Sequence, residues 1–84
     1  MGTKDKLIER FKRRPRDYTW NELVRLFGIF GFVIDHKGKT SGSRVSLTKG
    51  NYRFYAHRPH PSNIVKESVL HSALEFLKNN GFID

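Results

Sequence analysis

Apolar and polar residues alternate along two neighbouring segments in the second half of the chain. The alternation covers residues 45–48 and 52–56, and it is typical of strands with one buried face. Gly50 and Asn51 lie between the two segments, and both residue types tolerate the positive φ of a two-residue turn. The pattern therefore predicts a β-hairpin that turns at these two residues.

This turn determines which residues face each other across the predicted hairpin. Apolar residues then meet apolar residues on one face, whereas a shift by one residue would mix the two faces. The apolar face is expected to belong to a core, and the opposite face is the predicted binding surface. We call this opposite face the outer face; it consists of the pairs Arg44–His57, Ser46–Tyr55 and Thr48–Arg53, while Val45–Ala56, Leu47–Phe54 and Lys49–Tyr52 are the remaining pairs.

Helical periodicity appears in three further segments. Lys4 to Arg14 forms a short predicted helix that Pro15 stops. A stronger pattern runs from Thr19 to Phe30, where Thr19 and a glutamate three residues later form a capping box. The last helix is expected to start at a cap at Ser62 or Asn63 and to run to about residue 80. The apolar stripe of the second helix consists of Trp20, Leu23, Val24, Phe27 and Phe30. The apolar stripe of the last helix consists of Val65, Val69, Ala73, Phe76 and Leu77.

One more strand is predicted at residues 32–36, with Phe32 and Ile34 directed inward. The chain is therefore expected to be an α+β domain of αβββα order with an extra N-terminal helix. A three-stranded antiparallel sheet with helices on one face is the simplest packing of these elements. Residues 1–17 are interpreted as a basic helix and connector, and residues 18–84 as the domain proper.

Composition narrows the possible functions. The chain has 84 residues and no cysteine, so one domain is expected, without disulfides, a Cys-based zinc site or a thiol nucleophile. No apolar run approaches the roughly 18 residues of a membrane helix, and the first residues do not resemble a signal peptide. We expect a cytoplasmic protein that is not embedded in a membrane.

The net charge of +8 indicates a polyanionic partner, most simply nucleic acid. The excess is concentrated in residues 4–17 and 35–60. The basic run at residues 12–16 is either a solvated connector or a contact to a nucleic-acid backbone. Residues 37–43, KGKTSGS, do not match a phosphate-binding P-loop, although their glycines and hydroxyls would allow close approach to a phosphate.

The order of several short motifs resembles the HicA toxin family, whose members cleave RNA and are partnered by HicB antitoxins. Gly31–Phe32 looks like the family's junction between helix and first strand. Gly42–Ser43–Arg44 stands where the family has Gly-Ser-His, and His60–Pro61 looks like its His-Pro segment. The final helix, with residues 76–81 at its end, completes a resemblance that covers residues 18–83. It implies a fold similar to the double-stranded RNA-binding domain, RNA as a partner, and a HicB-like antitoxin as a possible second partner.

The chain departs from the family at Arg44, which occupies the position of the catalytic histidine. Metal-independent RNA cleavage needs a base for the 2′-hydroxyl proton, and an arginine stays protonated. Arginine is, however, well suited to binding a phosphate. His57, directly opposite Arg44 in the predicted hairpin, is the candidate replacement base; the alternative is that His57 and His60 only shape the following turn.

Three functions remain open at this point. The chain is an RNA-binding module with weak or absent nuclease activity, an active endoribonuclease with a relocated base, or a module that docks an acidic, HicB-like protein. No cofactor is expected, and the four scattered histidines make a metal site improbable. The predicted RNA contacts are Lys37, Lys39, Ser43, Arg44, Ser46, Arg53, Tyr55, Arg58 and His60.

Overall fold

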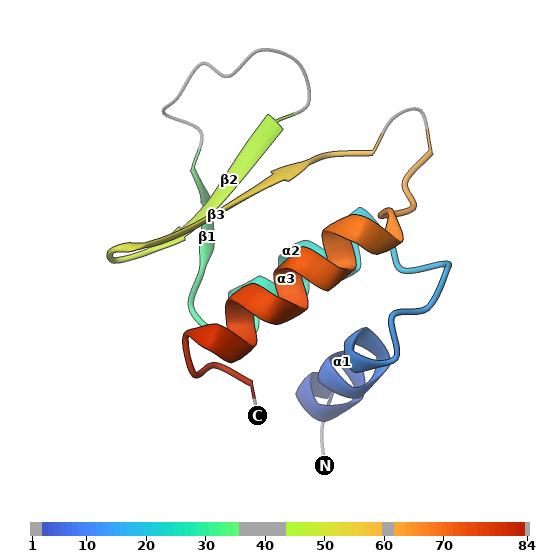
Figure 1. Ribbon diagram of the computed structural model, residues 1–84, viewed down its shortest axis with the longest axis horizontal. Coiled ribbons are helices and arrows are strands. Elements are labelled where there is room, and N and C mark those ends of the chain that lie inside the picture. The colour runs from blue at the N-terminus through green and yellow to red at the C-terminus, as the bar shows by residue number, and fades with distance from the viewer. Residues whose placement is uncertain (1–2, 36–43, 60–61, 84) are drawn as a thin grey trace.

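The chain folds into three helices and one three-stranded sheet (Figure 1). The computed structural model describes residues 3–35, 44–59 and 62–83. The predicted α+β class and element order are confirmed. The elements are α1 (Thr3–Lys12), α2 (Trp20–Ile29), β1 (Val33–Asp35), β2 (Arg44–Lys49), β3 (Tyr52–His57) and α3 (Glu67–Asn79).

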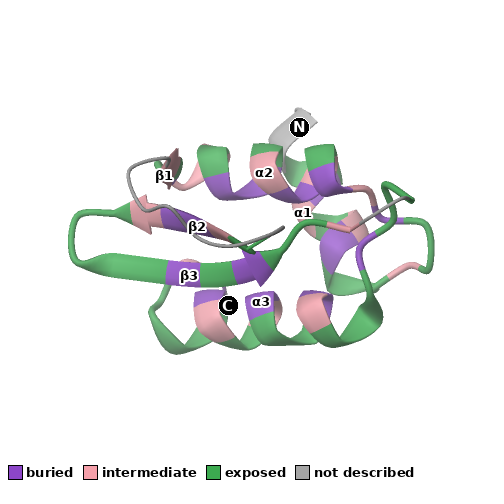
Figure 2. Ribbon diagram, turned by 90° about the horizontal axis from the view of Figure 1, so that it is seen from above, coloured by how far each residue is buried: buried purple, intermediate pink, exposed green. Residues whose placement is uncertain are grey.

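The elements form layers with the sheet on one side (Figures 1 and 2). The strands lie in the order β1-β2-β3, and both neighbouring pairs are antiparallel. Both α2 and α3 cover the same face of the sheet, with α2 packed against β1 and α3 against β3. The first helix, α1, packs on α2 and α3 on the side away from the sheet. Among the described residues, the other face of the sheet therefore carries no helix.

The register of the hairpin is the one that the sequence predicts. All six cross-strand pairs between β2 and β3 match, including Leu47 with Phe54 and Arg44 with His57. Gly50, in the turn, has a φ of 56°, a conformation that glycine adopts without steric cost. Because the side-chain period of a strand is two, this register separates a core face from a polar face.

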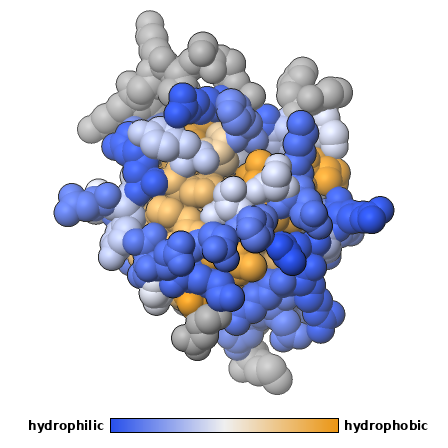
Figure 3. Space-filling view, in the orientation of Figure 1, coloured by the Kyte–Doolittle hydropathy of each residue, from blue (hydrophilic) through white to orange (hydrophobic). Residues whose placement is uncertain are grey.

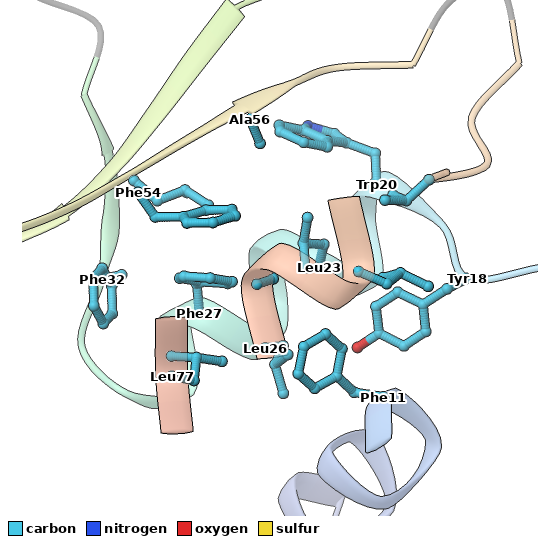
Figure 4. Close-up of a cluster of buried hydrophobic side chains, with 14 of the residues drawn as sticks. Phe11, Tyr18, Trp20, Leu23, Leu26, Phe27, Phe32, Phe54, Ala56 and Leu77 are labelled. Atoms are coloured by element: carbon cyan, nitrogen blue, oxygen red, sulfur yellow. The ribbon is translucent and has the colours of Figure 1, made fainter. Parts of the chain in front are cut away.

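An aromatic cluster fills the space between the sheet and the helices (Figure 4). The ring of Phe27 on α2 lies 5.2 Å from that of Phe54 on β3 and 5.2 Å from that of Phe32. Leu7 and Phe11 of α1 belong to the same buried cluster, so α1 shares the hydrophobic core of the other elements. In Figure 3, apolar side chains show between the sheet and α3, and hydrophilic ones cover most of the remaining surface in view.

Side-chain caps hold both ends of α2. The predicted capping box is present: Thr19 accepts a hydrogen bond from the backbone of Glu22, and the Glu22 carboxylate accepts one from the backbone of Thr19. At the other end, Nζ of Lys49 donates to the carbonyl of Phe30 at 2.7 Å. A cation at a helix C-terminus also interacts favourably with the helix dipole. Lys49 therefore has a structural contact, although it contributes to the basic charge of the hairpin.

The last helix begins later than predicted. A cap at Ser62 or Asn63 is wrong, because α3 starts at Glu67 after an N-cap at Lys66 that makes no side-chain cap bond. Residues 63–65 instead run extended beside residues 18–20, with backbone hydrogen bonds of 2.9 and 2.8 Å. Val65 is buried, but it belongs to this extended segment and not to the apolar stripe of the helix.

Arg10 links α1 to the start of α2. Its Nε donates to a carboxylate oxygen of Glu22 at 2.8 Å, and its Nη2 donates to Asp17 at 3.0 Å. The hydrogen bond that Glu22 accepts from Arg10 holds the pKa of the Glu22 carboxyl below its ordinary value. The guanidinium also lies over the ring of Tyr18. Burial of the Tyr18 phenol raises its pKa above the ordinary value.

We expect the contact between Arg10 and Glu22 to make stability depend on pH. The folded pKa of Glu22 is depressed, so its contribution is present above the unfolded value of about 4.3 and is lost as the pH falls through the folded value. Glu22→Gln keeps a capping-box residue but loses the charge. It should cost about 1 kcal/mol or less at neutral pH, since the pair is partly exposed.

Urea denaturation at a series of pH values measures this effect. Glu22→Gln should flatten the loss of stability on acidification, whereas Glu9→Gln, in an exposed pair with Arg13, should leave the pH curve close to that of the wild type. If Glu22→Gln follows the wild-type curve throughout, the charge of Glu22 does not stabilise the fold.

Candidate nucleic-acid interface

The outer face lies on the side of the sheet opposite α2 and α3. Alternation along β2 and β3 directs Arg44, Arg53, Tyr55 and His57 to this side, and all four residues are exposed. Thr48 is partly buried between Val33 and Arg53 in the strand register. The predicted outer face is thus present as a continuous surface over two strands.

Tyr55 and two arginines form the most distinctive cluster on the outer face. The guanidinium carbon of Arg44 lies 4.9 Å from the centroid of the Tyr55 ring, and that of Arg53 lies 6.0 Å from it. Both distances fall within the range of cation–π attraction. Tyr55 nevertheless remains 49% exposed. The cluster therefore combines two positive charges with an accessible aromatic ring.

An ion pair on the same side joins the two edge strands of the sheet. Nη1 of Arg53 on β3 lies 3.5 Å from Oδ2 of Asp35 on β1. In the register, Asp35 is opposite Ser46, and Ser46 is opposite Tyr55. Asp35 therefore restricts the position of the Arg53 guanidinium. The role of Asp35 was missed at the sequence level, although inward-facing Phe32 and Ile34 already imply that position 35 points outward.

Ser46 is more covered than the sequence predicts for an RNA contact. It lies on β2, the central strand, and is only 7% exposed between its neighbours on β1 and β3. Central strands have a neighbour on both sides, and a short side chain is shielded by longer ones on each. We therefore do not include the Ser46 hydroxyl among the groups open to a ligand.

His57 and Arg58 extend the surface beyond the cluster. His57 pairs directly with Arg44 at the end of the hairpin, a relation that brings side chains within reach of each other. Both His57 and Arg58 are exposed. They also line a pocket of about 530 Å³ between the end of β3 and the start of α3, to which Lys66 contributes another cation. Positive charge thus continues from the outer face toward the N-terminus of α3.

Four of the predicted contacts lie outside the described residues: Lys37, Lys39, Ser43 and His60. They remain predictions from the sequence. His71 is described and lies on α3, where its Nδ1 is 2.9 Å from Nη1 of Arg14. Its contact is with the connector after α1, so His71 is not part of the outer face.

Within residues 3–35, 44–59 and 62–83, no group of three or more His, Cys, Asp or Glu side chains could hold a metal ion. Over the same described part of the chain, no helix has both the length and the apolar character needed to cross a membrane.

Comparison with family models, with curated proteins and with solved structures found no match to this chain. The molecule is therefore classed by its own fold and surface. It is a small α+β domain whose sheet has helices on one face and a basic, partly aromatic surface on the other.

Proposed function

We propose that the protein binds RNA in the cytoplasm through the outer face. The observation that carries this proposal is the cluster in which Arg44 and Arg53 flank the exposed ring of Tyr55. Arginine binds phosphate oxygens through paired N–H donors, and an aromatic ring offers a stacking surface for a base. The net charge of +8 adds a general attraction to a polyanion.

Binding with little or no cleavage is the form of this function that we favour. The resemblance to the HicA family motivates RNA as the ligand and a HicB-like antitoxin as a further partner. In that resemblance, Arg44 replaces the histidine that would act as the base. A permanently protonated guanidinium can hold a phosphate, but it cannot accept the 2′-hydroxyl proton.

Endoribonuclease activity is the second candidate, and the pairing of Arg44 with His57 supports it. In this mechanism the His57 imidazole takes the proton of a ribose 2′-hydroxyl, whose oxygen then attacks the adjacent phosphorus. The bond from phosphorus to the 5′-oxygen breaks, giving a 2′,3′-cyclic phosphate, and water supplies a proton to the departing oxygen. Arg44 would stabilise the negative charge that develops on the phosphate.

Incubation of the purified protein with a mixed RNA pool in EDTA tests both candidates. We expect the wild type to bind RNA, more weakly as salt is raised because bound phosphates release counterions, and to leave the RNA intact. Arg44→His should gain cleavage, since it restores a base at the position of the family's histidine. Cleavage by the wild type that His57→Ala abolishes would establish the second candidate instead.

Absence of RNA binding at low salt would overturn the proposed function. The basic outer face would then be more consistent with an acidic protein partner, and a small antitoxin-like reading frame beside the gene would be the next observation to seek.

A further inference from the structure

Tyr55 is the exposed aromatic residue of the cluster with Arg44 and Arg53. It lies on β3 in the outer face, with the guanidinium carbons of Arg44 and Arg53 at 4.9 Å and 6.0 Å from its ring centroid. About half of the residue is still exposed, so the two cations do not cover the ring completely. The exposed part of the ring and the two guanidinium groups are thus offered to a ligand side by side.

We infer that the outer face selects unpaired RNA, with one base stacked on Tyr55 and the flanking phosphates bound by Arg44 and Arg53. This inference rests on the proposed RNA-binding function and adds the class of RNA. It differs from recognition of a double helix, which depends on shape and on contacts of ribose and phosphate across a groove.

The exposed ring of Tyr55 is the reason why we expect the outer face to prefer a single strand to a duplex. Bases within a duplex are stacked on each other and paired, so a side chain on an open sheet cannot stack on them. Unpaired bases can turn outward and stack on tyrosine or on an arginine plane. The ring of Tyr55 would add little to the binding of a duplex, whereas it can contribute directly to the binding of a single strand.

Two residues of β1 lie beside this arrangement. Asp35 lies 3.5 Å from the Arg53 guanidinium, so less side-chain freedom is lost when Arg53 binds a phosphate. The Asp35 carboxylate also competes with the phosphate for this cation, which leaves Arg44 as the stronger phosphate contact of the two. Val33, opposite Thr48 in the register, is 64% exposed and places an apolar group on the same side of the sheet. The three strands together span about 10 Å, which leaves room for a second nucleotide beside the one on Tyr55.

Fluorescence anisotropy with three labelled probes tests the inference. The probes are a short single-stranded uridine RNA, the same strand with abasic riboses, and the uridine strand annealed to its adenosine complement. We expect the wild type to bind the uridine strand more tightly than the abasic strand or the duplex. Tyr55→Ala should weaken binding of the uridine strand by about 5- to 150-fold and leave binding of the abasic strand almost unchanged.

Tyr55→Phe is the matched control, since it keeps the ring and loses only the hydroxyl; it should bind the uridine strand within about twofold of the wild type. Thermal unfolding of each variant checks that the fold is retained. If Tyr55→Ala binds the uridine strand as tightly as the wild type, or weakens both single strands equally, stacking on Tyr55 is excluded while RNA binding stands. Equal or tighter binding of the duplex by the wild type also overturns the inference. If no probe binds the wild type, the proposed function itself fails.

Discussion

Phe54→Ala is expected to lower the free energy of unfolding by about 3–5 kcal/mol. Phe54 is 8% exposed, and its ring lies 5.2 Å from those of Phe27 on α2 and Phe76 on α3. Removal of the ring leaves a cavity where the sheet meets both helices. Since small domains have a total stability of about 5–15 kcal/mol, this one change should remove a large part of it. Urea denaturation measures the loss as a lower transition midpoint.

Tyr55→Ala is the matched control, because Tyr55 is the next residue along β3 and points to the opposite side of the sheet. Its exposed ring makes cation–π contacts but fills no core space, so we expect a loss of less than about 1 kcal/mol. A larger loss for Tyr55→Ala than for Phe54→Ala would mean that the buried and exposed faces of the hairpin are reversed. Equal losses would mean that the hairpin does not separate a buried face from an exposed one.

The double variant Arg44→Gln, Arg53→Gln is expected to bind RNA much more weakly and with a lower dependence on salt. Each phosphate contact to a single strand contributes about 0.7 to the slope of log affinity against log salt, so the slope should fall by about 1.4. At low salt we expect the affinity for a single-stranded RNA to fall by more than about tenfold. Anisotropy titrations between about 50 and 200 mM salt measure both quantities.

A second double variant with the same net charge separates a local effect from a general one. Arg25→Gln, Lys78→Gln changes two exposed cations on α2 and α3, the helices on the other side of the sheet. If the outer face binds the RNA, this variant should keep nearly the wild-type salt slope. Equal weakening by the two double variants would show that binding follows net charge and has no preferred face.

The hairpin could be predicted from the sequence because the residues that determine its turn and register are close together along the chain. A turn of Gly50 and Asn51 and the alternation on each side leave one register that separates apolar from polar residues, and this register places Arg44 opposite His57. The capping box at Thr19 is also local, since the interacting groups are three residues apart. These features account for most of the outer face.

The remaining features depend on contacts between distant segments. The start of α3 could not be placed correctly, because residues 63–65 pair with residues 18–20 instead of joining the helix. Burial of Ser46 follows from the central position of β2 in the sheet, and the pairing of Arg53 with Asp35 follows from the addition of β1 beside it. The order of strands in the sheet, which periodicity alone does not determine, decides the last two of these points.

A map of amide chemical-shift changes on adding a single-stranded uridine RNA tests most directly whether the outer face is the RNA-binding surface. We predict that the largest changes follow β2 and β3, at Arg44, Tyr55 and His57, and diminish as salt is raised. Changes confined to α1, α2 or the helix side of the sheet would contradict the proposed binding surface.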